Sequence, residues 1–82
     1  IILQDESVLE HLDDWLDELD EKQREVVVRR FGLRNHPRGT LEEVGLELGV
    51  TRERVRQVQM EALRRLRRIL ENSGYSRDNI LQ

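Results

Sequence analysis

Hydrophobic side chains recur at helical spacing in the first quarter of the chain. Val8, Leu12, Trp15 and Leu19 are separated by three or four residues, which places them on one face of a helix. Ser7 stands just before them and belongs to the residue types that commonly cap helices. We therefore expect a first helix capped by Ser7, with Trp15 in the core.

A second helix is expected to follow directly. Asp20 can cap it, and its apolar positions include Val26 and Phe31. Gly32 is placed to end this helix in a left-handed turn. Residues 34–39 then contain the single proline together with turn-forming residues, which predicts a surface loop.

Two further helix starts are marked beyond this loop. Thr40 and Glu43 match a capping box, in which a hydroxyl and a carboxylate reciprocally bond free backbone amides. Gly49 arrives nine residues after Thr40, so the third helix is expected to be short. Thr51 offers the next cap, and the fourth helix is expected to run from there to about Glu71.

The third and fourth helices match a helix-turn-helix. Two helices joined by a tight turn cross steeply only if the contact points are small or apolar and the turn tolerates a left-handed residue. Gly45 is expected to let the fourth helix approach the third, and Gly49 to make the turn. Seven positions match this pattern and favour it over an ordinary helical hairpin: Val44, Gly45, Leu48, Gly49, Val50, Val55 and Val58. We predict an all-α fold, a four-helix domain containing a helix-turn-helix with a long recognition helix.

The outward face of the fourth helix carries residue types that bind base edges. Arginine can donate a fork to guanine, glutamate can accept from cytosine, and glutamine can bind adenine. The candidate base-reading residues are Arg52, Glu53, Arg56 and Gln57. The alternative is a solvated face with internal contacts, such as those of Glu53 with Arg56 or Gln57. The position immediately after the turn favours DNA binding.

Phosphate-binding candidates stand near the helix starts. The first backbone amides of a helix are free and carry a partial positive charge, so Leu41 and Glu42 can offer N–H groups to an anion. Thr51 adds a hydroxyl, although capping alone accounts for this residue about as well. Arg30 and Arg54 complete the candidate phosphate contacts.

Charge is strongly segregated along the chain. The net charge is −3, but residues 1–25 hold ten acidic and two basic side chains, whereas residues 52–68 hold seven arginines and two glutamates. The acidic part repels DNA and the basic helix attracts phosphate. Four arginines lie beyond the reading end of this helix: Arg64, Arg65, Arg67 and Arg68. They are suited to acidic protein partners, or simply to stabilising a helix carboxyl end.

The composition excludes several classes of protein. Without cysteine, neither a disulfide framework nor a thiolate metal site is possible, and a reducing cytoplasm fits. No apolar run approaches the length of a membrane span. His11 and His36 are isolated and no catalytic constellation emerges, so we expect no enzyme, cofactor, metal or small-molecule substrate. The chain starts at Ile1 and its only methionine is Met60, so we expect it to be part of a longer polypeptide.

Three strings resemble region 4, the carboxy-terminal domain, of bacterial primary-type sigma factors. They are Arg-Phe-Gly-Leu at 30–33, Thr-Leu-Glu-Glu-Val-Gly at 40–45 and Thr-Arg-Glu-Arg-Val-Arg-Gln at 51–57. Residues 58–67, which follow the third string, are most similar to the stationary-phase, general-stress type, because the housekeeping type usually has a basic residue where Glu61 stands.

The resemblance covers almost the whole chain and implies its division. Residues 1–39 correspond to the helices of region 4.1, residues 40–72 to the helix-turn-helix of region 4.2, and residues 73–82 to a C-terminal tail. The resemblance also implies a bacterial, cytoplasmic transcription factor domain that binds promoter DNA.

The resemblance further implies sequence-specific binding of double-stranded DNA at the −35 promoter element during transcription initiation. It places Arg52, Glu53 and Gln57 at base edges, with Arg56 close by. It also implies docking on the flap-tip helix of the RNA polymerase β subunit. The residues matched to that docking are Phe31, Leu63 and Leu66. The distal arginines match the stretch that activators touch, and an anti-sigma factor is a further possible partner.

Two other interpretations stay open from the residues alone. A free-standing helix-turn-helix regulator would use the same reading head as its DNA-binding output domain, but would normally need a dimerisation surface. A pure protein-interaction module would use the acidic and basic faces for protein partners and show no preference among DNA sequences.

Overall fold

The structure is a computed structural model that describes residues 6–74, with side chains described from Glu10 onward. It has four helices, α1 (Glu6–Asp17), α2 (Glu21–Phe31), α3 (Leu41–Leu48) and α4 (Arg52–Asn72). The predicted tail from Tyr75 to Gln82, and the packing predicted for Val8, lie outside what the structure describes. The all-α prediction is confirmed for the described part of the chain.

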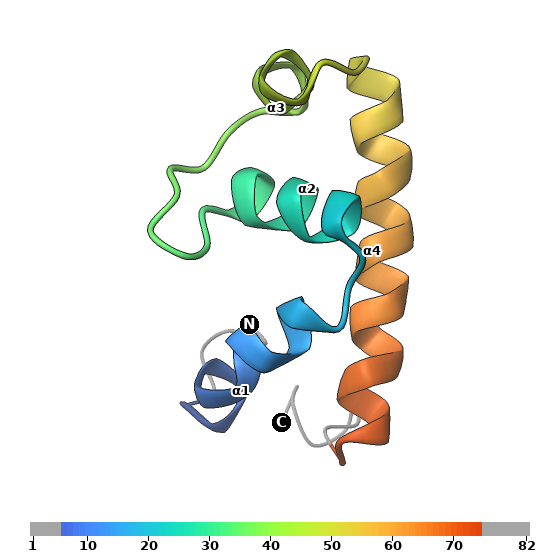
Figure 1. The fold of residues 1–82 in the computed structure, drawn as a ribbon. Coiled ribbons are helices and arrows are strands. Elements are labelled where there is room, and N and C mark those ends of the chain that lie inside the picture. The colour runs from blue at the N-terminus through green and yellow to red at the C-terminus, as the bar shows by residue number, and fades with distance from the viewer. Residues whose placement is uncertain (1–5, 75–82) are drawn as a thin grey trace.

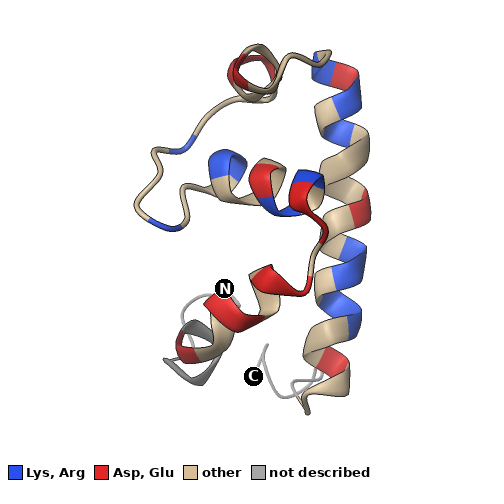
Figure 2. Cartoon of the chain, viewed as in Figure 1, with Lys and Arg blue, Asp and Glu red and all other residues tan. Residues whose placement is uncertain are grey.

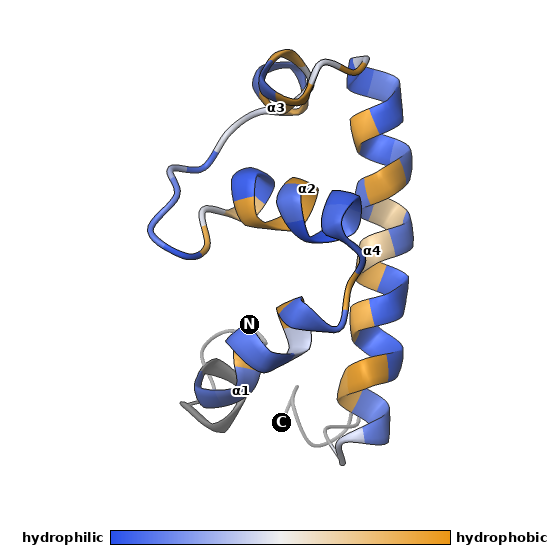
Figure 3. Cartoon of the chain, in the orientation of Figure 1, coloured by the Kyte–Doolittle hydropathy of each residue, from blue (hydrophilic) through white to orange (hydrophobic). Residues whose placement is uncertain are grey.

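The long helix α4 forms the spine of the domain. Figure 1 shows α1, α2 and α3 arranged along one side of α4, with α2 running across it and α3 beside its start. Hydrophobic residues occur along the whole length of α4, separated by hydrophilic ones (Figure 3). This single helix therefore supplies part of the core beneath each of the other three.

Three helices begin directly after the residue that was predicted to cap them, namely Asp20, Thr40 and Thr51. The Asp20 carboxylate accepts from the backbone N–H of Gln23 at 2.8 Å, and Thr40 and Glu43 form the expected capping box. Gly32 ends α2 in the left-handed conformation, with φ 66°. The prediction for Ser7 was wrong, because α1 begins at Glu6 and Ser7 lies inside its first turn.

The core consists of clusters that lie on either side of α2. One contains Leu16, Leu19, Val27, Val28 and Ala62, and the next contains Val26, Val44, Val55 and Val58. Because neighbouring residues of α2 enter different clusters, α2 joins the packing of α1 to that of the helix-turn-helix. Trp15 is buried against Leu70, a core position near the end of α4 that the sequence pattern did not single out.

Two predicted glycines shape the helix-turn-helix, Gly49 in the turn and Gly45 inside α3, and the close approach at Gly45 differs from the prediction. Gly49 is left-handed, with φ 71°. A Cβ on Gly45 would lie 2.7 Å from the carbonyl oxygen of Val50 and 3.5 Å from the backbone nitrogen of Arg52. It is thus the turn backbone that approaches Gly45 most closely, whereas we had expected α4 to do so.

Polar contacts tie the α2–α3 loop to the helices. Arg34 donates to the carboxylates of Asp13 and Asp17, both at 2.9 Å, although its own backbone is left-handed with φ 51°. Arg29 pairs with Glu25 of its own helix and with Glu47 of α3. These contacts attach the loop to α1, and α2 to α3, at the surface.

Candidate nucleic-acid interface

The start of α4 is built to present its first two turns to solvent. The Thr51 hydroxyl accepts from the backbone N–H of Arg54 at 3.0 Å, which fixes where the helix begins. Val55 is fully buried and Val58 nearly so. With these two side chains packed against α2 and α3, the side chains on the opposite face of the helix must point away from the protein.

The four candidate base-reading residues share this outward face. Arg52, Glu53, Arg56 and Gln57 are all exposed. They follow directly from the turn, so the first two turns of α4 project at the same end of the domain as α3 (Figure 1). The structure thus brings together the set that the sequence indicated, and nothing in the described chain covers it.

Glu53 and Arg56 are joined by an ion pair, which was the sequence-based alternative for this face. The Arg56 Nε donates to Glu53 Oε1 at 2.6 Å, and Nη2 donates to Oε2 at 2.9 Å. These bonds lower the pKa of Glu53 and raise the pKa of Arg56. Because both side chains are exposed, the pair adds little to folding stability, and its presence is compatible with DNA binding.

The start of α3 leaves two backbone amides available. The capping box uses the N–H groups of Thr40 and Glu43, with Glu43 accepting at 2.8 Å. The same bond from the Thr40 amide holds the pKa of the Glu43 carboxyl below its usual value. The amides of Leu41 and Glu42 have no partner among the described residues, as the phosphate-binding prediction requires.

Arg30 is less free than the sequence indicated. Its Nη1 donates to the carbonyl oxygen of Gly39 at 3.1 Å, its Nε is buried without a partner, and its guanidinium lies 5.8 Å from the Phe31 ring centroid. Arg30 therefore braces the segment that leads into α3. Only the part of the guanidinium not used by Gly39 is available to an anion.

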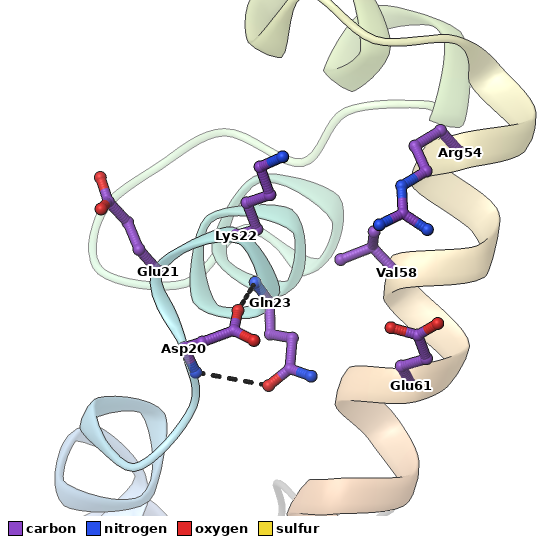
Figure 4. A pocket seen from close by; sticks show the side chains of 7 residues that line it. All are labelled: Asp20, Glu21, Lys22, Gln23, Arg54, Val58 and Glu61. Carbon is purple, nitrogen blue, oxygen red and sulfur yellow. Dashed lines mark hydrogen bonds between the residues drawn. The ribbon is translucent and has the colours of Figure 1, made fainter.

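Lys22 is a basic residue at this surface that the sequence did not indicate. Lys22 and Arg54 line the same groove between the start of α2 and α4, and Figure 4 shows their side chains at one end of it. Glu61 lies further along the groove, below Val58. The sequence did not indicate Lys22 because it stands in a strongly acidic stretch, and only the packing of α2 against α4 brings it into the groove that Arg54 also lines.

The residues matched to polymerase docking are partly assembled. Phe31 and Leu66 pack at the edge of the same core cluster. Leu63, on the turn of α4 before Leu66, keeps 37% of its surface exposed. Leu63 is thus the most exposed of the three residues, whereas Phe31 and Leu66 are partly buried.

The four distal arginines have different environments. Arg65 donates to the Gln23 side chain at 3.3 Å and Arg67 pairs with Glu71 at 3.2 Å, whereas Arg64 and Arg68 are exposed and have no partner within the described part of the chain. In Figure 2 basic residues follow one another along this half of α4, while acidic residues gather on α1.

Residues 6–74 contain no group of three or more His, Cys, Asp or Glu side chains that could hold a metal ion. No helix in this range is long and apolar enough to cross a membrane.

Comparison with known proteins assigns the fold to a family. Residues 15–68 match the family described as "Sigma-70, region 4". The chain is 48% identical over 79 residues to RNA polymerase sigma factor RpoS of Coxiella burnetii (strain RSA 493 / Nine Mile phase I), covering 96% of this chain and 22% of that protein. It is 52% identical over 62 residues to RNA polymerase sigma factor SigA of Bacillus sp, covering 76% of this chain and 16% of that protein.

The chain therefore spans about a fifth of the length of the curated relatives that it matches. The family match covers both helices of the helix-turn-helix up to Arg68, together with α2 and the end of α1. On this match, and on the capped helix-turn-helix with the exposed start of its second helix, the chain belongs to the sigma-70 region 4 family.

Proposed function

We propose that this domain binds double-stranded DNA at the −35 promoter element as part of an RNA polymerase sigma factor. The observation that carries the proposal is the start of α4, where four polar side chains suited to base edges project from a helix anchored by buried Val55. Its role is to hold polymerase at a promoter during transcription initiation. Promoter melting and catalysis belong to other parts of the enzyme.

In this proposal the bases are read in the major groove by Arg52, Glu53 and Gln57, with Arg56 beside them. The phosphates are held by the free amides of Leu41 and Glu42 and by side chains around the reading helix. These side chains are Thr51, Arg54, Arg30 and, added from the structure, Lys22. Such contacts orient the helix without carrying sequence information.

The protein partners follow from the remaining surfaces. We propose that Phe31, Leu63 and Leu66 dock on the flap-tip helix of the polymerase β subunit. Activators are proposed to bind the distal arginines, among which Arg64 and Arg68 are the freest; Arg65 and Arg67 already hold partners within α2 and α4. An anti-sigma factor would compete for the same faces.

The division of the chain and its subtype belong to the same proposal. Residues 1–39 would form region 4.1, residues 40–72 region 4.2 and residues 73–82 the tail, in a protein of the bacterial cytoplasm. Glu61 supports the stationary-phase, general-stress subtype, because the housekeeping type usually has a basic residue at this position. Glu61 lines the groove that also holds Lys22 and Arg54, and its negative charge does not favour a phosphate contact there.

Titration against promoter DNA tests the function. The 82-residue chain is titrated against a duplex carrying a −35 element and against a scrambled duplex, with and without a flap-tip peptide. Arg52→Ala is expected to lose about 1–3 kcal/mol of binding free energy and to relax the preference at one base pair. Arg68→Ala, a change of the same charge about 24 Å further along α4, is the matched control.

The outcomes separate the competing interpretations. If Arg52→Ala binds the −35 duplex as tightly and selectively as the parent, the base-reading assignment is wrong. Equal binding of the parent to both duplexes, together with binding of the peptide, would favour a pure protein-interaction module. Binding that needs two half-sites and a dimer would favour a free-standing regulator.

A further inference from the structure

The proposed reading face contains one pair of side chains that is already ordered without DNA. Arg56 grips the Glu53 carboxylate with two nitrogens, Nε to Oε1 at 2.6 Å and Nη2 to Oε2 at 2.9 Å. Such bidentate, charge-assisted bonds fix direction as well as distance. By comparison, Gln57 accepts one long bond of 3.4 Å from Arg54. Of these two candidate acceptors on α4, Glu53 is the more firmly held.

We propose that Arg56 is a positioning residue, which holds the Glu53 carboxylate in the orientation in which it accepts a hydrogen bond from a base. This inference rests on the proposed function, because it needs Glu53 to face the bases of a −35 element. It gives Arg56 a role that acts through Glu53, whereas direct reading of a base by Arg56 would be independent of Glu53.

The geometry leaves the carboxylate able to serve a base. A carboxylate oxygen has two acceptor positions, and Oε1 of Glu53 accepts a single bond from Arg56, so one position on Oε1 stays free for a base. Oε2 accepts from both Nη2, at 2.9 Å, and Nε, at 3.3 Å. The Glu53 side chain remains 60% exposed and that of Arg56 52% exposed, so DNA could reach the pair. The Nε–Nη2 edge of Arg56, one of the edges that a guanidinium offers to guanine, is already occupied by Glu53.

The charges of the pair also favour this role. A lone carboxylate would be repelled by the phosphates on either side of the groove, and the adjacent guanidinium offsets that repulsion. A glutamate carboxylate is ionised at neutral pH and acts only as an acceptor, and the pairing with Arg56 lowers the pKa of Glu53 further. An acceptor that cannot donate suits cytosine, which presents an amino donor in the major groove without the neighbouring N7 acceptor that adenine adds.

One substitution that keeps the charge and one that removes it can separate the positioning role of Arg56 from its charge. Arg56→Lys keeps the positive charge but loses the planar fork, and Glu53→Gln removes the carboxylate. We would also make the double variant, and Glu71→Gln as a control that breaks the Arg67–Glu71 ion pair elsewhere on α4. Each 82-residue chain is titrated against −35 duplexes in which every position is changed through all four base pairs.

We expect Arg56→Lys to reduce discrimination at a single position by about two- to fivefold, the scale of an exposed ion pair, and to leave the other positions unchanged. That position is the one at which Glu53→Gln loses discrimination. The double variant is expected to discriminate like Glu53→Gln alone, since Arg56 has nothing left to orient. The NMR signal of the Arg56 Nε–H in the free chain should lose its protection from exchange in Glu53→Gln but keep it in Glu71→Gln.

Three results would overturn the inference while leaving the proposed function intact. The first is full discrimination by Arg56→Lys. The second is an equal loss at every position, which would mean a general effect on binding. The third is a further loss when Arg56→Lys is added to Glu53→Gln, which would mean that Arg56 reads a base by itself. If the parent chain shows no preference for the −35 duplex over a scrambled one, the proposed function itself fails.

Discussion

Replacing Gly45 with alanine tests the close approach on which the helix-turn-helix depends. The new Cβ would lie 2.7 Å from the Val50 carbonyl oxygen, closer than such atoms come in real structures. The obstacle is backbone in a tight turn, whose Val50 N–H also bonds the Gly45 carbonyl at 2.9 Å. Relief therefore requires the turn to move away from α3.

The expected change in the free energy of unfolding is the difference between a gain in helix propensity and a cost of overpacking. Alanine in a helix interior gains about 1 kcal/mol over glycine. Overpacking against a well-fitted site costs about 1–3 kcal/mol. We expect Gly45→Ala to lower the free energy of unfolding by on the order of 1 kcal/mol, which for a chain of this length lowers Tm by roughly 4–8 °C.

Thermal unfolding followed by circular dichroism measures this change. Leu46→Ala is the matched control, because Leu46 is on the same helix, is 82% exposed and should change the free energy of unfolding by less than about 0.5 kcal/mol. The −35 affinity of Gly45→Ala should also fall, since a displaced turn separates the α3 amides from the reading helix. A Tm for Gly45→Ala above that of the parent would refute the reasoning, because it would mean that the turn yields at no cost.

Three further predictions concern a cap, a surface tie and a phosphate contact. Thr40→Ala removes the acceptor for the Glu43 amide, so we expect a loss of about 1 kcal/mol in chemical denaturation; no change in the midpoint would contradict the capping role. Arg34 lowers the pKa of Asp17, so this pairing stabilises the fold above the ordinary pKa of an aspartate and is lost as pH falls through the lowered value. Urea midpoints from pH 6 to pH 2 should therefore fall less steeply in Arg34→Gln than in the parent chain. If the midpoints of both chains fall in parallel, the Arg34–Asp17 ion pair does not stabilise the fold. Lys22→Ala should reduce the slope of log affinity against log salt by about 1 and leave base preference unchanged, whereas an unchanged slope would place Lys22 away from phosphate.

Local signals in the sequence predicted the helix boundaries well. The caps at Asp20, Thr40 and Thr51 and the left-handed glycines 32 and 49 were all predicted, because each depends on residues within one turn of the chain. The inward face of α4 followed from helical periodicity for the same reason. These features place the reading face, so the candidate base contacts could be chosen from the sequence as well.

Contacts between distant residues could not be predicted in this way. Arg34 is separated by 17 positions from Asp17 and by 21 positions from Asp13, the two residues of α1 that it bonds. These bonds depend on a loop conformation that the sequence did not reveal. The place of Lys22 beside Arg54 depends on how α2 crosses α4. The burial of Leu70 likewise requires α1 to reach the far end of α4. Periodicity shows which face of a helix is apolar but not which partner covers it.

The continuity of α4 gives the domain a mechanical property. No glycine or proline interrupts the 21 residues from Arg52 to Asn72, so the helix is a rod of about 30 Å. Its first turns face outward beside α3, while its last turns are clamped to α1 through Leu70 and Trp15. A tilt of about 5° imposed at the clamped end would displace the tip by about 2.6 Å, comparable to the length of a hydrogen bond. In the proposed function, a protein bound at the distal arginines could thus shift the proposed base contacts at the other end of α4 without touching DNA.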